Sequence, residues 1–340
     1  MNIGVLGCGS WGTALSILLA RNGHEVCLLG RNAEELHVLT NYRENLRYLP
    51  GFAIPSEVRF QFLTERLEAS DLLVIAVPSS AVRSVIHEFE GSHPLIAIAS
   101  KGLEPGSAKF MVNVVEEARP TSQIGVLSGP NLAIEIARGI PTVALSAFSD
   151  LTAASAVQGA FGCGTFRVST TDDVIGVELA GALKNVLAIG AGMSDGLGFG
   201  DNTKGAFLSR GLMEMARLGL AMGGRMETFL GPAGVGDLFA TAASGLSRNY
   251  RLGNALGKGV SLEAALEEIG QVAEGVPTSE AVQLLARRHG VQVPVFAAVE
   301  SVLHGKVPAR KAVGLLMDKA PKVEDFLSPV DEHKENGRPS

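Results

Sequence analysis

Short apolar runs alternate with longer amphipathic stretches through the first half of the chain. The apolar runs, rich in Val, Ile and Leu as buried strands are, span residues 3–6, 26–29, 72–77, 95–99, 124–127 and 142–145. Between several of them, apolar residues recur three and four positions apart, which predicts helices over residues 14–22, 80–89, 108–119 and 132–138. Continuous apolar strands separated by amphipathic helices are typical of a parallel sheet covered on both faces. The pattern therefore predicts a doubly wound α/β domain.

The pattern changes in the second half of the chain. From Asp172 to about Pro321, β-rich runs nearly vanish and segments rich in Ala, Leu and Gly follow helical periodicity. We therefore expect a first domain over residues 1–170, an all-helical second domain over residues 171–326 and a polar, disordered tail over residues 327–340.

Residues 41–55 interrupt the rhythm of the first domain. This segment contains Pro50, Gly51 and Pro55, which are typical of turns and irregular structure. It predicts a long irregular loop that could lie over a ligand.

Composition narrows the class of protein. The 340 residues are 46% hydrophobic and 19% charged, and 29 Lys+Arg against 35 Asp+Glu give a formal charge of −6. Such a chain folds into about two domains and attracts polyanions weakly, so we expect no nucleic-acid partner. No stretch approaches the roughly 18–20 apolar residues of a membrane span, and the strand beginning at Ile3 leaves no room for a signal peptide.

The cysteines indicate the redox setting. Cys8, Cys27 and Cys163 are odd in number and lack CxxC spacing, which argues against both a disulfide framework and a structural zinc site. No cluster of His, Cys and carboxylates offers another metal site. We therefore expect a cytoplasmic protein without a metal.

Residues 7–12, GCGSWG, match the motif G-x-G-x-x-G. The motif follows the strand at residues 3–6 and opens a helix, the context in which a diphosphate binds backbone N–H groups at a helix N-terminus. There Gly7 permits the tight turn, Gly9 lets phosphate approach, and Gly12 lets the helix pack close to the strand. A turn that is merely glycine-rich would not need this context. The motif therefore predicts a Rossmann-type dinucleotide site.

The residue that selects between NAD and NADP is expected about 20 residues further on, at the end of the second strand. There the chain reads Gly30-Arg31-Asn32, with no acid to accept a bond from the ribose 2′-hydroxyl. A cation without a neighbouring acid suits a 2′-phosphate, so we predict that NADP is preferred and that NAD is also accepted. The alternative is that Arg31 is an ordinary surface charge.

Lysine is the candidate for acid/base chemistry. None of the seven histidines falls between Ser100 and Arg288, the region expected to enclose a substrate. Lys101 follows a strand at a carboxyl end of the sheet, where open α/β folds bind ligands. Lys184 lies early in an apolar helix beside small residues, so that a ligand could come close, although a lone lysine there can also be a snorkelling side chain. Burial and cationic neighbours can lower a lysine pKa to about 7–8.

Two further segments carry polar side chains suited to a substrate. Asp237 follows a glycine-rich stretch, with Thr241 one turn later on the same face, but it could serve only as a helix N-cap. Arg248, flanked by Ser247 and Asn249, offers a planar fork that suits bidentate contact with phosphate. Surface arginine is common, so the triplet alone decides nothing.

Two alternatives with different chemistry are open at this point. Gly192, Ser194 and Gly196 match G-x-S-x-G, the nucleophile elbow of serine hydrolases, but the elbow needs a preceding strand and the residues before Ser194 are helical in pattern. A dinucleotide-sensing module without catalysis is also compatible with the fold. Such a module would not need Lys101 and Lys184 together.

These residues, with further segments, resemble one family from residue 2 to about residue 320. In chain order, the segments are 7–12, 45–51, 100–102, 128–131, 177–185, 200–204, 234–238, 247–249 and 272–275. They are similar to bacterial glycerol-3-phosphate dehydrogenase (NAD(P)+). The combination of residues 178–185 with residues 247–249 is the most specific part of the resemblance.

The resemblance implies reversible reduction of dihydroxyacetone phosphate to sn-glycerol 3-phosphate with NAD(P)H, for phospholipid synthesis. It implies that Lys184 is the acid/base, assisted by Lys101 and Asp237. The implied substrate site is Lys101, Gly129, Asn131, Lys184, Asn185, Asp237, Thr241, Ser247, Arg248 and Asn249. The implied cofactor site is Gly7, Gly9, Ser10, Trp11, Gly12, Arg31, Lys101, Ala133, Arg248, Val272 and Glu274. Asn131 departs from the Ser or Thr that members often carry.

A related enzyme would share much of this pattern. A ketopantoate reductase, or another β-hydroxyacid dehydrogenase, would have the same fold and a catalytic lysine. The Ser247-Arg248-Asn249 triplet instead favours a phosphorylated small-molecule substrate. The exposed helical surfaces would permit a homodimer.

Overall fold

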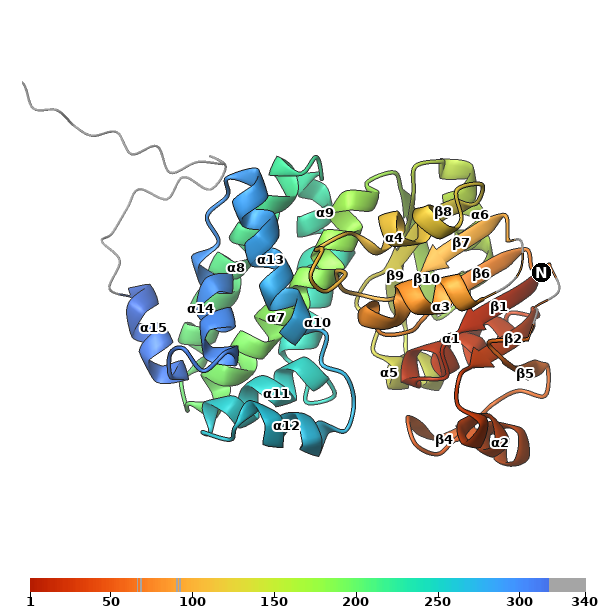
Figure 1. The fold of residues 1–340 in the computed structure, drawn as a ribbon, viewed down its shortest axis with the longest axis horizontal. Helices are drawn as coiled ribbons and strands as arrows, with labels where there is room; N and C mark the ends of the chain where they lie inside the picture. The colour runs from red at the N-terminus through yellow and green to blue at the C-terminus, as the bar shows by residue number, and fades with distance from the viewer. Residues whose placement is uncertain (66, 68, 90, 92, 318–340) are drawn as a thin grey trace, which may run out of the picture.

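The computed structural model describes residues 1–317 apart from residues 66, 68, 90 and 92, so the tail expected at residues 327–340 lies outside the described residues. Within them, an eight-stranded sheet forms the centre of the N-terminal half, and a bundle of helices follows it (Figure 1). The strand order is β10-β9-β8-β7-β6-β1-β2-β5. The strands are β1 Asn2–Leu6, β2 Glu25–Gly30, β5 Val58–Phe62, β6 Leu72–Ile75, β7 Leu95–Ile98, β8 Gln123–Ser128, β9 Thr142–Phe148 and β10 Phe166–Thr171. The predicted fold class, a doubly wound α/β sheet followed by helices, is confirmed.

Helices cover both faces of the sheet. Successive residues of a strand point to opposite sides, so a continuous apolar strand makes both faces apolar. In β6, Leu72 and Val74 pack into one apolar cluster, whereas Leu73 and Ile75 pack into another. The first cluster is completed by α1 Ser10–Arg21, α5 Ala133–Arg138 and α6 Leu151–Phe161. The second is completed by α3 Val82–Glu88 and α4 Met111–Ala118. Burial on both faces explains why the central strands read as continuous apolar runs.

The prediction of a parallel sheet is wrong at one edge. β8 pairs antiparallel with β9, and β10 continues parallel to β9. The connection between β8 and β9 carries only α5, which has six residues and is therefore about 9 Å long. Such a helix does not run back along the whole of β8, and the chain re-enters the sheet in the opposite direction.

The apolar runs in the sequence did not predict the edge strands β5 and β10. In β5, Arg59 and Gln61 alternate with apolar residues, and in β10 Arg167 and Ser169 do the same. These strands are buried less completely than the central ones, so they lack the continuous apolar run by which a strand of a parallel sheet is found.

The irregular loop expected over residues 41–55 is largely regular structure. Helix α2 (Ala33–Tyr42) extends into it, and β3 (Glu44–Asn45) pairs antiparallel with β4 (Leu49–Ala53). Pro50 and Gly51 are accommodated because β4 pairs only with the two-residue strand β3, which leaves most of its backbone unpaired.

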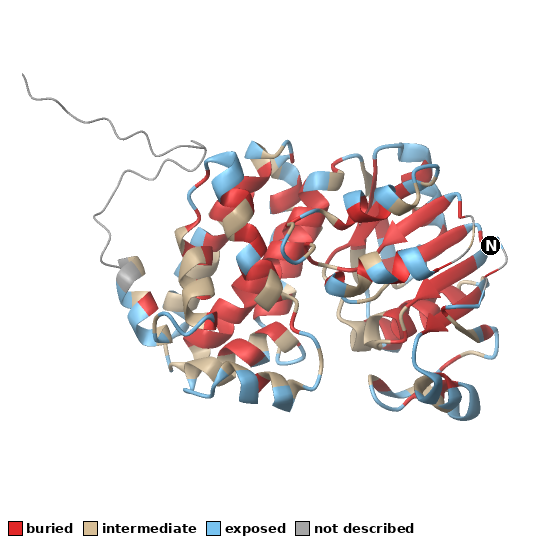
Figure 2. Cartoon of the chain, viewed as in Figure 1, coloured by how far each residue is buried: buried red, intermediate tan, exposed pale blue. Residues whose placement is uncertain are grey.

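The C-terminal half is built around α7 (Val174–Gly196), which is buried along most of its length (Figure 2). The elements around it are α8 Asp201–Ala221, α9 Met226–Leu230, a π-helical turn Pro232–Gly236, α10 Asp237–Ala242, α11 Arg248–Gly257, α12 Leu262–Ile269, α13 Gly275–His289, α14 Pro294–Leu303 and α15 Ala309–Met317. One apolar cluster joins α7 to its neighbours.

Helix α7 contradicts the expectation that no stretch of the chain approaches the length and apolarity of a membrane span. It is long and apolar enough to cross a bilayer, with a mean hydropathy of 1.6 over an 18-residue window, and it alone among the described helices is so. Of that window, 89% is buried inside the protein. A helix without a polar face avoids water, and it can do so either in a bilayer or, as here, at the centre of a helical bundle.

Glycines bring the backbones of α7 and α11 into contact. A Cβ atom on Gly192 would lie 2.1 Å from the carbonyl oxygen of Tyr250, and one on Gly253 would lie 1.8 Å from that of Ile189. Both distances are far below a van der Waals contact. The glycines are therefore required for the two helices to approach this closely.

This packing also disposes of the serine hydrolase alternative. Gly192 and Gly196 are contact points between helices, and Ser194 between them is buried inside α7, with no strand before it. The nucleophile elbow needs a serine exposed on a turn between a strand and a helix.

Gly253→Ala should destabilise the protein by about 3 kcal/mol, because a methyl group forces α11 away from α7. Gly205→Ala is the matched control, since Gly205 is an exposed residue of α8 with nothing within 4 Å of its Cβ position. That control should change stability by less than about 1 kcal/mol, in the stabilising direction. Chemical denaturation measures both, and equal losses would contradict the packing account.

Candidate active site

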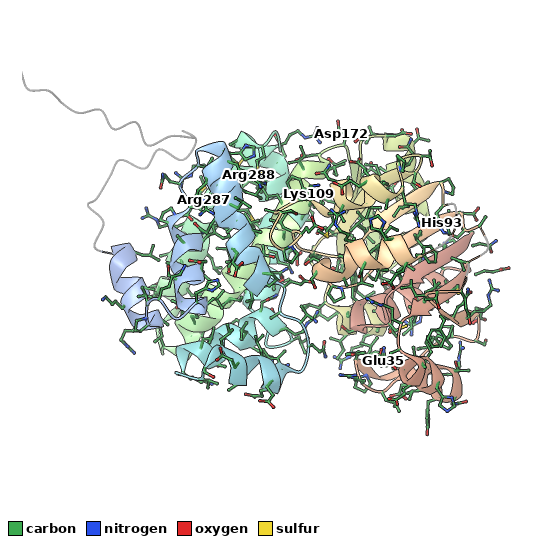
Figure 3. The ribbon with its side chains drawn as sticks, in the orientation of Figure 1. Glu35, His93, Lys109, Asp172, Arg287 and Arg288 are labelled. Carbon is green, nitrogen blue, oxygen red and sulfur yellow. The ribbon has the colours of Figure 1, made fainter. Side chains whose placement is uncertain are left out.

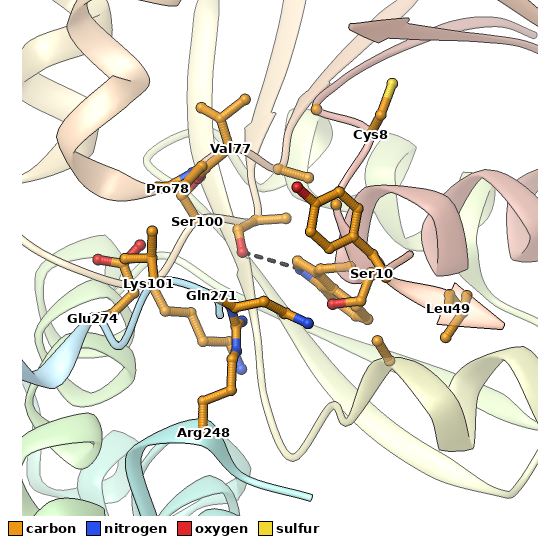
Figure 4. Close-up of a pocket in the computed structure, with 18 of the residues that line it drawn as sticks. Cys8, Ser10, Leu49, Val77, Pro78, Ser100, Lys101, Arg248, Gln271 and Glu274 are labelled. Carbon is orange, nitrogen blue, oxygen red and sulfur yellow. Dashed lines mark hydrogen bonds between the residues drawn. The ribbon is translucent and has the colours of Figure 1, made fainter. Parts of the chain in front are cut away.

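A cleft of about 690 Å³ lies at the carboxyl ends of the central strands, between the sheet and the helical half. Open α/β folds bind their ligands at this position. Figure 4 shows Arg248 and Gln271 reaching into the cleft beside Lys101, with Ser10 and Leu49 on the opposite wall. Every residue expected at the site lines the cleft except Gly12, Gly129 and Asp237, which lie behind its surface.

The glycine turn is shaped to receive a diphosphate. Gly7 has φ +116°, a conformation that side chains rarely adopt, and a Cβ on Gly12 would lie 1.9 Å from the Gly7 carbonyl oxygen. By contrast, a Cβ on Gly9 would meet nothing within 4 Å, so the turn is open at that point. No side chain caps α1, which begins at Ser10, so its first N–H groups are available to an anion. The turn therefore fits the dinucleotide that its sequence predicts.

Asn45 holds this turn in place. Its amide nitrogen donates to the Cys8 carbonyl oxygen and to the Thr13 hydroxyl, both at 2.8 Å, and its amide oxygen accepts from the Tyr48 N–H. The hairpin that carries Asn45 is thereby fixed to both sides of the glycine turn. Sequence analysis gave Asn45 no role of its own, because its partners are more than thirty residues away.

Arg31 lies at the far end of the cleft and has an acidic neighbour. Its Nη2 lies 3.5 Å from Oε1 of Glu88, and both side chains are about half exposed. No acid is next to Arg31 in the sequence, but the prediction that none lies beside it is wrong, because the folded chain brings Glu88 next to Arg31. Glu88 comes from the end of α3, which the spacing around Arg31 does not reveal.

Two lysines share one buried carboxylate at the centre of the site. Lys184 Nζ donates to Asp237 Oδ1 at 2.9 Å and to the Thr241 hydroxyl at 2.7 Å. Lys101 Nζ donates to Asp237 Oδ2 at 2.7 Å and to the Gly129 carbonyl oxygen at 2.8 Å. Lys184 does not snorkel to solvent, since its side chain is only 8% exposed. Asp237 is not a helix cap, because it accepts no backbone bond at the start of α10.

The three groups shift one another's proton affinity. Burial lowers the pKa of Lys184 to about 8, and the positive charges of Lys101 and Arg248 act in the same direction against the attraction of Asp237. Burial alone would raise the pKa of Asp237, but the two lysines outweigh it and hold that pKa below its ordinary value. Asp237 therefore stays ionised while Lys184 can exchange a proton near neutral pH.

Small residues on α7 make room for Lys101. A Cβ on Gly181 would lie 2.8 Å from the Ser128 hydroxyl and 3.8 Å from Cγ of Lys101. The lysine stem thus passes directly over the helix that carries Lys184. The small face that the sequence predicted to admit a ligand or another backbone admits a side chain of the sheet domain.

A chain of amides ties the start of α11 to α7. Asn185 accepts a bond from Asn249 at 2.9 Å, and Asn249 accepts one from the Gly275 N–H at 3.0 Å. Ser247 caps α11 by accepting from the Tyr250 N–H. These bonds fix the backbone on both sides of Arg248.

Among the described residues, the guanidinium of Arg248 and the Oδ1 atom of Asn131 have no hydrogen-bond partner in the protein. Within the described residues, no hydrogen bond or ion pair engages the half-buried guanidinium of Arg248. Asn131 donates to the Val143 carbonyl oxygen, whereas its own buried Oδ1 has no partner. An unpaired guanidinium in a cleft suits an anion with several oxygens.

Comparisons with known proteins identify the family of the chain. The chain matches the model of the NAD-dependent glycerol-3-phosphate dehydrogenase N-terminus over residues 2–154 and that of the C-terminus over residues 173–314. A glycerol-3-phosphate dehydrogenase [NAD(P)+] of Bacillus mycoides is 46% identical over 329 residues, covering 95% of this chain and 97% of the relative. One from Desulfitobacterium hafniense is 45% identical, covering 95% and 92%. The crystal structure of glycerol-3-phosphate dehydrogenase from Coxiella burnetii superposes with a TM-score of 0.88 at 36% identity, covering 94% of this chain and 99% of that one.

Proposed function

The chain belongs to the NAD-dependent glycerol-3-phosphate dehydrogenase family, and on that premise we propose how its cleft carries out the reaction. It is an NAD(P)-dependent oxidoreductase that reversibly reduces dihydroxyacetone phosphate to glycerol 3-phosphate. A supply of glycerol 3-phosphate for phospholipid synthesis is consistent with this activity. The family match decides against a ketopantoate reductase and against a module that only senses a dinucleotide.

The glycine turn and the start of α1 hold the diphosphate of the cofactor. Ser10 and Trp11 lie on the first turn of α1, and the Trp11 indole is fixed by a bond to the Ala99 carbonyl oxygen at 3.1 Å. Ala133, at the start of α5, and Val272, just before α13, also line the cleft. When bound, the reduced nicotinamide supplies the hydride.

Lys184 is the acid that protonates the new hydroxyl group. Negative charge develops on the C2 oxygen of dihydroxyacetone phosphate as the carbonyl is reduced, and an ammonium group aimed at that oxygen stabilises it. Asp237 orients the ammonium group of Lys184, and Lys101 adds a second positive charge. In the oxidative direction, neutral Lys184 accepts the proton instead.

The substrate phosphate binds Arg248. Ser247, Asn249 and Asn185 fix the backbone around Arg248. Thr241 and the Gly129 carbonyl oxygen accept bonds from the two lysines, and Asn131 lines the cleft. The observation that carries the proposal is the unpaired guanidinium in the same cleft as the Asp237-bridged lysines. An anchor remote from the reacting carbon can hold the carbonyl in register for reduction.

The proposal also includes the domain boundary, the oligomeric state and the cellular location. We place the domain boundary between β10 and α7; the expected end of the helical domain at residue 326 lies outside the described residues. A homodimer formed through the helical surfaces and a cytoplasmic location complete it. Within the described residues, no group of three His, Cys, Asp or Glu could hold a metal ion.

A comparison of three carbonyl compounds tests the function. With NADPH, dihydroxyacetone phosphate should exceed unphosphorylated dihydroxyacetone by about a thousandfold or more in kcat/KM, because only the phosphate engages Arg248. Ketopantoate should not react. Turnover of ketopantoate but not of the triose phosphate would overturn the assignment.

The same assay with Arg248→Ala supplies the internal control. The variant should lose about a hundredfold in kcat/KM with the phosphorylated substrate and less than about threefold with dihydroxyacetone. Arg287→Ala, at an exposed position on α13, should change neither.

Cofactor choice is tested at Arg31 and Glu88. Arg31→Ala should lower kcat/KM for NADPH about tenfold and leave NADH within about twofold, because only NADPH carries the 2′-phosphate and the site is solvent-exposed. Glu88→Gln should raise the preference for NADPH a few-fold, since it removes a charge that competes for Arg31 and repels phosphate. Steady-state kinetics with both cofactors measures the ratio, and an unchanged ratio in both variants contradicts the assignment.

A further inference from the structure

Glu274 joins the helical half to the sheet across the mouth of the cleft. It precedes α13, and its Oε1 accepts a bond from the Ser79 N–H at 2.9 Å, while its Oε2 accepts one from the Ser79 hydroxyl at 2.5 Å. Ser79 opens the 3₁₀ turn Ser79–Ala81, which leads from β6 into α3. A carboxylate from one half thus occupies the N-terminal capping position of a helical segment in the other.

The pair is enclosed on the side of the catalytic lysines. Ser79 is 2% exposed. A Cβ on Gly102 would lie 2.6 Å from the Ser79 hydroxyl and 3.1 Å from Oε2 of Glu274. The residue after Lys101 therefore rests directly against the pair, as the position of Glu274 beside Lys101 in Figure 4 also shows.

The other side of the pair is tied to the anion-binding turn. Gly275, the residue after Glu274, donates its N–H to the Asn249 side chain. Arg248, next to Asn249, lies close enough for its charge to act on Glu274. Burial raises the pKa of Glu274, whereas the two bonds from Ser79 and the charge of Arg248 act against that rise. Glu274 thus stands between the turn that carries Arg248 and the turn that carries Lys101.

A second hydrogen bond between α13 and the sheet half is of a different kind. At the C-terminal end of the helix, Arg288 donates to the Ser107 carbonyl oxygen at 3.1 Å on the exposed surface, on the side where Figure 3 places Lys109. An exposed bond of this kind contributes little. The Ser79–Glu274 pair is doubly bonded, with Ser79 buried and Glu274 lining the cleft.

We propose that Glu274 is a positioning residue that acts through Ser79: by holding the start of α13 against the turn after β6, it sets the spacing between Arg248 and the lysine pair. The resemblance implied only a cofactor contact for Glu274, but both of its carboxylate oxygens are engaged by Ser79. The kinetic part of this inference rests on the proposed function, whereas the bond itself belongs to the ligand-free chain.

A double-mutant cycle tests whether Glu274 and Ser79 act as one unit. Ser79→Ala should lower kcat/KM for dihydroxyacetone phosphate about fivefold and Glu274→Ala about thirtyfold, the usual scale for hydrogen bonds to a charged group. The double variant should lie within about twofold of Glu274→Ala, because the second change removes a bond that is already lost. Ser80→Ala, one residue on and exposed, should match the wild type. Losses that multiply, or a Ser79→Ala variant equal to the wild type, would overturn the proposal.

Two readouts do not depend on turnover. The free energy of unfolding of the ligand-free variants should show the same non-additivity. NADPH titration followed by fluorescence of Trp11, which lines the cleft and is the one tryptophan in the sequence, should show it in the dissociation constant. If the wild type fails to reduce dihydroxyacetone phosphate, the proposed function fails while these two cycles still test the pair.

Glu274→Gln provides the rescue. Glutamine can accept the bond from the Ser79 N–H but carries no charge, so it should restore activity to within about fivefold of the wild type. It also replaces Glu274→Ala in the cycle if the alanine variant does not fold. A glutamine variant as impaired as the alanine variant would contradict positioning by hydrogen bonding.

Discussion

One buried carboxylate, that of Asp237, binds two ammonium groups that come from different halves of the chain. Lys101 arrives from the end of a sheet strand and Lys184 from the central helix of the bundle. With both lysines protonated, the cluster carries one positive charge in excess. That excess faces a cleft into which Arg248 adds another, so the site favours an anionic substrate and the anionic form of its reacting oxygen. The same three side chains therefore join the two halves and, in the proposed mechanism, perform the chemistry.

Glycines both beside the lysines and further along α7 make this arrangement possible. Gly181 lets the stem of Lys101 cross α7, and the contact between Gly192 and α11 brings the start of α11 over the same helix. The Asn185–Asn249 bond then fixes the register of the two helices beside Lys184. A side chain at the glycine positions would push apart groups that must act together within a few ångströms.

Much of this could be predicted from local patterns. The central strands are continuous apolar runs, and the G-x-G-x-x-G turn and the lysine at a strand end are recognisable from spacing and context. The edge strands β5 and β10 were missed because partial burial leaves no continuous apolar run. The strand β9 was predicted, but its antiparallel direction was not, because an apolar run does not report strand direction.

The contacts that sequence analysis missed share one cause. Asn45, Glu88 and Glu274 act on partners 32 to 195 residues away, and no spacing along the chain reports such pairs. The G-x-S-x-G match was misleading for a related reason: the glycines serve helix contacts, which a motif of five residues cannot distinguish from a nucleophile turn.

The most direct test of the central claim is the pH dependence of kcat/KM for reduction of dihydroxyacetone phosphate. Lys184 must be protonated to act as the acid, and its pKa is about 8, so kcat/KM should be level below that value and fall as pH rises through it. In Asp237→Asn the break should move to lower pH, because the carboxylate that favours the ammonium form is gone. A wild-type profile that stays level to pH of about 10, near the ordinary lysine pKa, or a break that Asp237→Asn leaves in place, would contradict the account.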